Sequence, residues 1–258
     1  MQKTLIIEIP YGGLGDHLFH SHLPRIAKET GRYDTVYISK KTIFRHPDNK
    51  YIVWDLNPFI DGFIDQPGIK CNLVEILKNV KKGVNLLDAI MLAYNLDDTQ
   101  RGHEPEIYYK PHFNATYHNV IFDPNYLSWV GVIDKRDIMY FLKKRKIQFD
   151  AVMKIRTDKS LYIPKASDVF IETVTLKDFC DLIYSSKKLF CLTSGTASLA
   201  SSLGKPATVF YGAKQDPGFR HSKIHEYIKV ERCPKSKILS FIKLPFYFIK
   251  KKLADFTL

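Results

Sequence analysis

Cysteine is scarce in this sequence, and none of it stands in a metal-binding pattern. The cysteines form no CxxC pair, and none lies beside a histidine at the spacing of metal ligands; they are Cys71, Cys180, Cys191 and Cys233. Such usage is typical of free thiols in a reducing cytoplasm. We therefore expect neither a disulfide framework nor a cysteine-based zinc site.

Long apolar runs are also missing. No segment approaches the ~18 uncharged apolar residues that a membrane-spanning helix needs, so none is expected. The start, residues 1–4, leads directly into a strand-like segment without the apolar stretch and cleavage site of a signal peptide. A length of 258 residues, of which 45% are hydrophobic, allows a substantial core in one or two domains.

Acidic residues are outnumbered by basic ones. The 39 Lys and Arg against 27 Asp and Glu give a formal charge of +12, and much of it lies in the last thirty residues. Such a surplus favours anionic partners: nucleic acid, anionic membrane or phosphorylated small molecules. No nucleic-acid recognition module accompanies the charge, so we do not expect a nucleic-acid partner.

Short apolar strands alternate with helical segments along the chain. We expect strands at 3–9, 35–39, 51–56, 119–122, 168–171, 189–192 and 207–211, and a short extended piece at 107–109. We expect helices at 17–30, 74–82, 135–146, 176–185 and 196–203. This alternation is typical of parallel α/β layers.

The pattern restarts after a segment without periodicity near residues 111–116. We therefore predict an α/β protein of two Rossmann-like doubly wound domains that face a cleft. The expected boundaries are 1–112 for an acceptor-side domain, 113–228 for a nucleotide-sugar domain and 229–258 for a basic amphipathic tail. Ligands of such sheets bind outside the carboxyl ends of the strands.

The first candidate loop is YGGLGDHLFHSH, Tyr11 to His22, between an expected strand and an expected helix. Gly12, Gly13 and Gly15 allow a tight turn and a close approach of ligand to backbone. A dinucleotide fingerprint is incomplete, because Leu18 stands where its third glycine belongs and residues 38–41 are basic where an acid is expected. We expect no nicotinamide or flavin cofactor.

Asp16 in this loop has two open interpretations. It either caps the helix that follows or acts as a general base on an alcohol nucleophile. On that helix His17 and His20 share a face and His22 lies away from it, which leaves too few ligands for zinc. We expect no metal, and keep His17 and His20 as candidates for hydrogen bonds to a substrate.

The second candidate loop follows the strand that ends at Leu192. Thr193-Ser194-Gly195-Thr196 enters a helix whose first backbone N–H groups are unpaired, and with the helix dipole they suit a diphosphate. The hydroxyls of Ser194 and Thr196 could add donors. A simple packing helix would explain its small residues, but not the run TSGT.

These two loops resemble signatures of GT-B glycosyltransferases, above all the heptosyltransferases of glycosyltransferase family 9. Their second signature is D-[ST]-G-x-x-H-x-x-x-A-L-x-[KR]-P, followed by a strand and a [FY]-G-x-x-x-P loop. Their first is G-D-x-[LI]-x-x-x-P. The matching residues here are Gly15-Asp16-His17-Leu18, Pro24, Thr193-Ser194-Gly195, Leu203-Gly204-Lys205-Pro206, Phe210-Tyr211-Gly212 and Asp216-Pro217-Gly218.

The resemblance implies an inverting glycosyltransferase that takes a sugar from a nucleotide-diphosphate donor. The implied acceptor is a saccharide, free or lipid-linked, of bacterial lipopolysaccharide, lipooligosaccharide or capsule. Asp16 matches the proposed base of the family, and neither metal nor other cofactor is implied. The diphosphate would be held by Thr193, Ser194, Gly195 and Thr196, with Lys214 and Arg220 as candidate cations.

Two positions depart from the family pattern. Thr193 stands where the family has aspartate, and Ser198 where it has histidine, so the resemblance does not imply ADP-heptose as the donor. Two other functions remain open. One is a nucleotide-sugar hydrolase or epimerase on the same fold, with His17 or His20 as the acting residue. The other is a non-catalytic membrane-associated scaffold.

The tail segment 235–252, KSKILSFIKLPFYFIKKK, interleaves six lysines with large apolar residues. It is suited to the interface of an anionic membrane, which predicts a peripheral protein at the inner face of the cytoplasmic membrane. The alternative is a C-terminal helix that folds back across the first domain.

Overall fold

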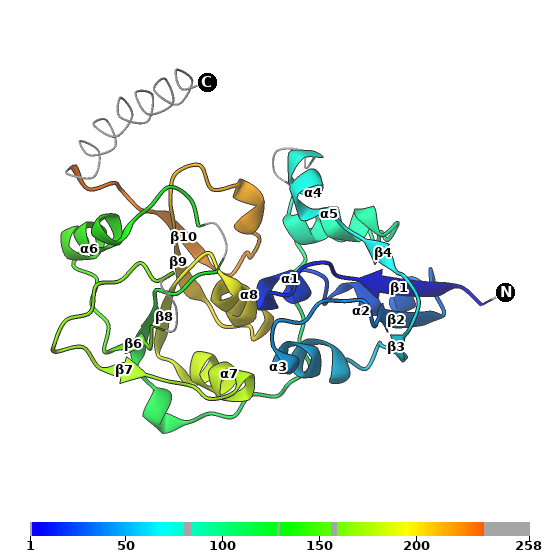
Figure 1. Ribbon diagram of the computed structural model, residues 1–258, viewed down its shortest axis with the longest axis horizontal. Helices are drawn as coiled ribbons and strands as arrows, with labels where there is room; N and C mark the ends of the chain where they lie inside the picture. Colours follow the sequence, from blue (N-terminus) through cyan, green and yellow to red (C-terminus); the bar gives the residue numbers. More distant parts are fainter. Residues whose placement is uncertain (1, 80–83, 128–129, 156–158, 235–258) are drawn as a thin grey trace, which may run out of the picture.

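The structure is a computed structural model and describes residues 2–79, 84–127, 130–155 and 159–234. It contains two parallel β-sheets side by side, each flanked by its own helices (Figure 1). This arrangement confirms the predicted fold class. The predicted tail segment 235–252 lies outside the described residues. Within them, no helix combines the length and the apolar character that crossing a bilayer requires.

The first sheet is built around two fully paired inner strands. Its strands are β1 (Thr4–Glu8), β2 (Thr35–Ser39), β3 (Gly62–Ile64) and β4 (Ile69–Lys70), in the order β3-β2-β1-β4. Leu5, Ile7, Val36 and Ile38 are fully buried, since helices cover this sheet. The helices of this half are α1 (Leu14–Leu18), α2 (Leu23–Glu29), α3 (Pro47–Lys50), the π-helical turn η1 (Tyr51–Asp55), α4 (Leu73–Asn79) and α5 (Leu86–Ala93).

The second sheet has the order β10-β9-β8-β5-β6-β7. Its strands are β5 (Val120–Asp123), β6 (Ala151–Met153), β7 (Phe170–Ile171), β8 (Lys188–Leu192), β9 (Ala207–Tyr211) and β10 (Glu226–Lys229). Its helical elements are α6 (Lys135–Lys144), α7 (Leu176–Ser185), α8 (Gly195–Ser202) and the short turns η2 (Ala115–Tyr117) and η3 (Pro217–Phe219). The side chains of Asp134 and Thr175 cap α6 and α7.

The predicted strand at 51–56 is wrong. Its residues form η1, which continues directly from α3. Pro47 in the first turn and the His46 side chain as cap start a helix here. Ile52, Val53 and Trp54 are all buried, and such a continuous apolar run does not distinguish a strand from a buried helix.

The predicted helix at 17–30 is two helices. The first, α1, begins three residues earlier than predicted, and the chain then turns through residues 19–22 before α2. Pro24 lies in the first turn of α2, where its missing N–H costs least. The proline therefore explains why a new helix begins at Leu23.

The two halves meet where α1 and α8 pack together (Figure 1). Further hydrogen bonds tie them: the Leu176 N–H donates to the Asp48 carboxylate at 2.9 Å, and the Asn85 amide donates to the His221 carbonyl at 2.7 Å. The last strand of the first sheet ends at residue 70, and the first strand of the second sheet begins at residue 120. The domain boundary at 112/113 stays a prediction.

Candidate active site

The two candidate loops touch each other at the centre of the molecule. A Cβ added to Gly195 would lie 3.4 Å from the Gly15 nitrogen, and one added to Gly15 would lie 3.6 Å from the Gly195 Cα. Both loops follow the carboxyl ends of central strands, β1 and β8. These distances are those of van der Waals contact, so the first turns of α1 and α8 pack directly against each other at Gly15 and Gly195.

Asp16 fills the first of its two predicted roles, that of a helix cap, and its environment bears on the second. Its Oδ2 accepts the Gly13 N–H at 3.1 Å, so the carboxylate does cap α1. Its side chain is partly buried, and desolvation raises its pKa although the Gly13 N–H and the Arg45 charge act in the opposite direction. A raised pKa brings a carboxylate closer to the range in which a general base works well.

Arg45 lies beside Asp16. This arginine was not singled out from the sequence. The Arg45 N–H donates to the Gly12 carbonyl at 3.1 Å and the Ile43 N–H to the Ile9 carbonyl at 3.1 Å, so this segment runs along the first loop. A Cβ on Gly13 would lie 2.8 Å from the Asp16 Oδ2 and 4.0 Å from an Arg45 guanidinium nitrogen. No local pattern in the sequence links Arg45 to this loop, because long-range backbone pairing brings it there.

His17 is a core residue, which corrects its prediction as a substrate contact. Its Nε2 donates to the Ile43 carbonyl at 3.0 Å, and its Nδ1 accepts the Trp54 indole N–H at 3.0 Å. The ring is fully buried and stacks on Phe44. Burial lowers its pKa to about 4, so the neutral imidazole holds the Arg45 segment against α1.

His20 is also fully buried, in the turn that follows α1. Its Nδ1 donates to the Asp16 carbonyl at 2.8 Å, and its ring lies edge-on to Tyr94. Burial lowers its pKa to about 4. Neither His17 nor His20 presents a free face to a ligand, and the described residues contain no cluster of three potential metal ligands.

The first turn of α8 offers backbone donors, while its hydroxyls are already engaged. The Ser194 hydroxyl donates to the Leu192 carbonyl at 3.3 Å, and Thr193 accepts a hydrogen bond from the Gln215 amide. The hydroxyl of Thr196 is buried and donates to Asp123 at 2.5 Å. The N–H groups at the helix start, beginning with Gly195, are therefore the part of this run best suited to an anion.

Asp123 at the end of β5 is a second residue that the sequence did not single out. Its carboxylate is almost fully buried and accepts hydrogen bonds from Thr196 and from the Asn125 backbone and side chain. The bond from Thr196 joins β5 to the first turn of α8, while the bonds from Asn125 stay within the loop after β5. In the sequence, Asp123 is marked only as an acidic residue at the carboxyl end of an expected strand.

The candidate cations lie on the loop after β9. Lys214 is exposed and has a left-handed φ of 62°. Arg220 is half-buried, with its guanidinium 4.4 Å from the centre of the Tyr211 ring. The structure orders Arg220 through this ring and leaves the Lys214 ammonium in solvent.

Ser198 is paired with a histidine from this same loop. Its hydroxyl lies 3.3 Å from His221 Nε2, and both side chains are buried. The sequence placed Ser198 where the resembled family has histidine. The fold thus brings the His221 imidazole next to Ser198.

No protein-family model matches the chain, and no curated protein does either. Solved structures do match. They include TibC, a dodecameric iron-containing glycosyltransferase from enterotoxigenic E. coli, with a TM-score of 0.57 and 13% identity over 90% of this chain and 64% of that one. They also include a family 9 glycosyltransferase from Veillonella parvula DSM 2008, with a TM-score of 0.54 and 11% identity over 94% and 89%.

A third match is the ADP-heptose lipopolysaccharide heptosyltransferase II of E. coli, with a TM-score of 0.52 and 12% identity over 88% of this chain and 90% of that one. This chain has the GT-B fold of the heptosyltransferases. It spans less than two thirds of the TibC chain. At these identities the GT-B likeness concerns the fold, and the activity has to be argued from the site.

Proposed function

We propose that this GT-B protein is an inverting glycosyltransferase. It would move a sugar from a nucleotide-diphosphate donor to a saccharide acceptor of lipopolysaccharide, lipooligosaccharide or capsule type. The observation that carries the proposal is the meeting of Asp16, with its raised pKa, and the open first turn of α8 at one junction. One structure of the same fold is a heptosyltransferase in complex with ADP-heptose, which supports a nucleotide-sugar donor.

The proposed reaction is a single displacement at the anomeric carbon. Asp16 takes the proton of the acceptor hydroxyl while that oxygen forms the new glycosidic bond. The bond from the anomeric carbon to the diphosphate breaks, and the leaving group carries the electron pair away. Attack from the face opposite the leaving group inverts the anomeric configuration.

Binding of the leaving diphosphate would rest on the α8 end of the site. The backbone N–H groups of Gly195 and Thr196 and the helix dipole face the negative charge that grows in the transition state. Arg220 and Lys214 would add positive charge from the neighbouring loop. The Ser194 and Thr193 hydroxyls would reach the donor only by exchanging their present internal hydrogen bonds.

Burial argues against the alternative in which a histidine does the chemistry. The side chains of His17 and His20 are both fully buried in the core, so neither can act directly on a nucleotide sugar. A peripheral position at the cytoplasmic membrane face, through segment 235–252, rests on the sequence alone and is kept as part of the proposal.

A thermal-shift panel of ADP-, GDP-, UDP- and CMP-linked sugars tests the proposal. A ligand at 100 times its dissociation constant that binds only the folded state adds about 2.7 kcal/mol of stability. We expect one nucleotide class to raise the melting temperature clearly. Product analysis with that donor then separates transfer from hydrolysis. No shift with any donor at millimolar concentration would count against the transferase and favour a non-catalytic scaffold.

A further inference from the structure

A cavity of about 620 Å³ lies at the amino edge of the second sheet, away from the candidate active site. Its lining includes Val120, Lys188 and Glu226, which are the first residues of β5, β8 and β10. The candidate active site lies at the opposite, carboxyl ends of the same strands. The cavity is therefore separate from the chemistry proposed above.

The end of α6 and the residues that follow it line one side of this cavity. The helix stops at Lys144, and Lys146 takes a left-handed φ of 52°, which turns the chain away. Beyond that point the almost fully buried Phe190 and the half-buried Ile228 line the cavity, together with Phe141 of α6. A left-handed φ favours glycine or asparagine, so a lysine at this turn keeps a positive charge at some conformational cost.

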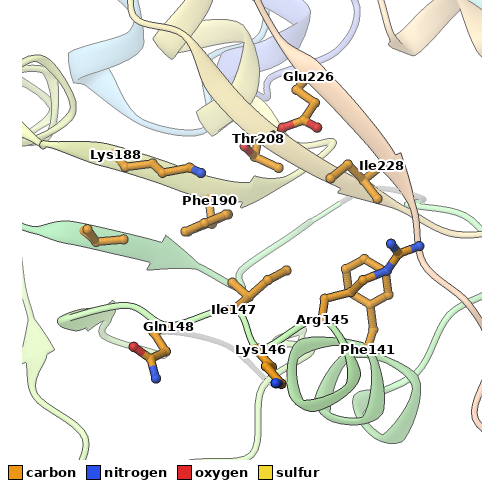
Figure 2. A pocket seen from close by; sticks show the side chains of 11 residues that line it. Phe141, Arg145, Lys146, Ile147, Gln148, Lys188, Phe190, Thr208, Glu226 and Ile228 are labelled. Carbon is orange, nitrogen blue, oxygen red and sulfur yellow. Dashed lines mark hydrogen bonds between the residues drawn. The ribbon is translucent and has the colours of Figure 1, made fainter.

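The cavity has an apolar floor and a cationic rim. The floor is formed by Phe190, Ile147 and Ile228, and Figure 2 shows Phe190 and Ile147 between Lys188 on the sheet and Lys146 at the end of α6. Lys188 lies 4.7 Å from the centre of the Phe190 ring. Among the described residues, Lys146 and Lys188 form no ion pair, whereas Arg145 of this rim pairs with Glu231 at 3.3 Å.

The charge of the rim decides which occupant fits. The rim carries three cations, Arg145, Lys146 and Lys188, and one acid, Glu226, which accepts the Thr208 hydroxyl. The chain's own tail segment 235–252 is apolar enough for the floor, but its six lysines would face like charges. An anion with an apolar body satisfies both the floor and the rim.

We propose that this cavity binds an anionic phospholipid. The phosphate would lie against Lys146 and Lys188, and part of an acyl chain would cover Phe190 and Ile228. Lysine-rich surfaces attract anionic leaflets, and buried acyl carbons add apolar stabilisation. Lys143 and Lys187, exposed neighbours of the rim residues in the sequence, add to the same positive charge, whereas Lys144 is paired with Glu231. This lipid site is independent of the glycosyltransferase proposal.

The test is calorimetric titration of the full chain with soluble short-chain lipids below their micelle concentration. The probes are dihexanoyl phosphatidylglycerol, dihexanoyl phosphatidylcholine and inorganic phosphate. We expect phosphatidylglycerol to bind at least about tenfold more tightly than the other two, a difference of about 1.4 kcal/mol. Equal binding of both lipids would overturn the proposal, and equal binding of phosphate would leave an anion site without a lipid.

Variants locate the binding. Lys146→Glu with Lys188→Glu should weaken phosphatidylglycerol binding at least about tenfold, while Lys110→Glu with Lys165→Glu, two exposed lysines outside the cavity, should not. Because both double variants keep the tail, its own lipid binding cancels in the comparison. Ile228→Phe fills the floor without changing charge and should weaken the lipid but not phosphate. Unchanged lipid binding in both cavity variants, each folded by circular dichroism, would place the site elsewhere.

Discussion

At the scale of single residues, the proposed chemistry depends on one carboxylate. Asp16→Asn removes the proton acceptor but keeps an oxygen that can accept the Gly13 N–H, so α1 stays capped. We expect sugar transfer to fall about 10²–10⁴-fold with a nearly unchanged melting temperature. The measurement is release of nucleoside diphosphate. Asp34→Asn, just before β2 and at the opposite strand ends from the junction, is the matched control and should leave the rate intact.

Arg45 should tune that carboxylate. Its charge lowers the pKa of Asp16 against the larger effect of burial, so Arg45→Met should raise that pKa further. The base is active when deprotonated, and the acidic limb of the rate profile should therefore move to higher pH. Because Arg45 is exposed, we expect a shift of less than about one pH unit, smaller at high salt.

Rate profiles of Arg45→Met and Lys41→Met provide the comparison. Lys41 is exposed and lies on the same segment, but its charge acts on Glu8 and not on Asp16. A shift of equal size in both variants would mean that general surface charge, and not Arg45, sets the Asp16 pKa.

At the scale of elements, the hydrogen bond from Thr196 to Asp123 fixes the start of α8 to the end of β5. Thr196→Val keeps the shape but withdraws one donor from a buried carboxylate, which should cost about 1–3 kcal/mol of unfolding free energy. Thr196→Ser keeps the hydroxyl and should lose much less. Urea denaturation of the two variants is the measurement. If valine and serine destabilise equally, the bond contributes little to holding α8.

The elements with clear local signals were predictable from the sequence. Strand β2, strand β9 and helix α7 lie where the sequence placed them, because turn residues, caps and short apolar runs bound them. Strands β3, β4, β6 and β10 and helix α5 were missed. Strands of this kind are specified by their neighbours in the sheet more than by their own residues. The predicted strand at 51–56 was wrong because consecutive buried apolar residues hide the periodicity that distinguishes a helix from a strand.

The same limit applies to the site. The sequence pointed to Asp16 and to the start of α8 because both sit in local glycine-containing motifs. It could not point to Arg45, which backbone pairing between distant segments brings to the first loop. His17 and His20 were also proposed from the sequence as substrate contacts, although both side chains are buried. So short a segment gives no sign of which of its side chains enter the core.

At the scale of the whole molecule, buried neutral histidines should set the acid limit of stability. Burial lowers the pKa of His17 and His20 to about 4 and that of His221 to about 3. In the unfolded chain histidine titrates near 6.5. Between about pH 6.5 and pH 4 the unfolded state therefore binds protons that the folded state does not.

As the pH is lowered across this window, the free energy of unfolding should fall by about 1.4 kcal/mol per pH unit for each such histidine. Urea unfolding from pH 7.5 to 4.5 measures that slope. His20→Phe removes one titrating group, so its slope should be smaller by about that amount whatever its stability at neutral pH. His112→Gln, whose side chain is 82% exposed, should keep the full slope. A flat stability profile between pH 6.5 and 4.5 would mean that these imidazoles take up protons in the folded protein, and that α1 is packed less tightly than the structure has it.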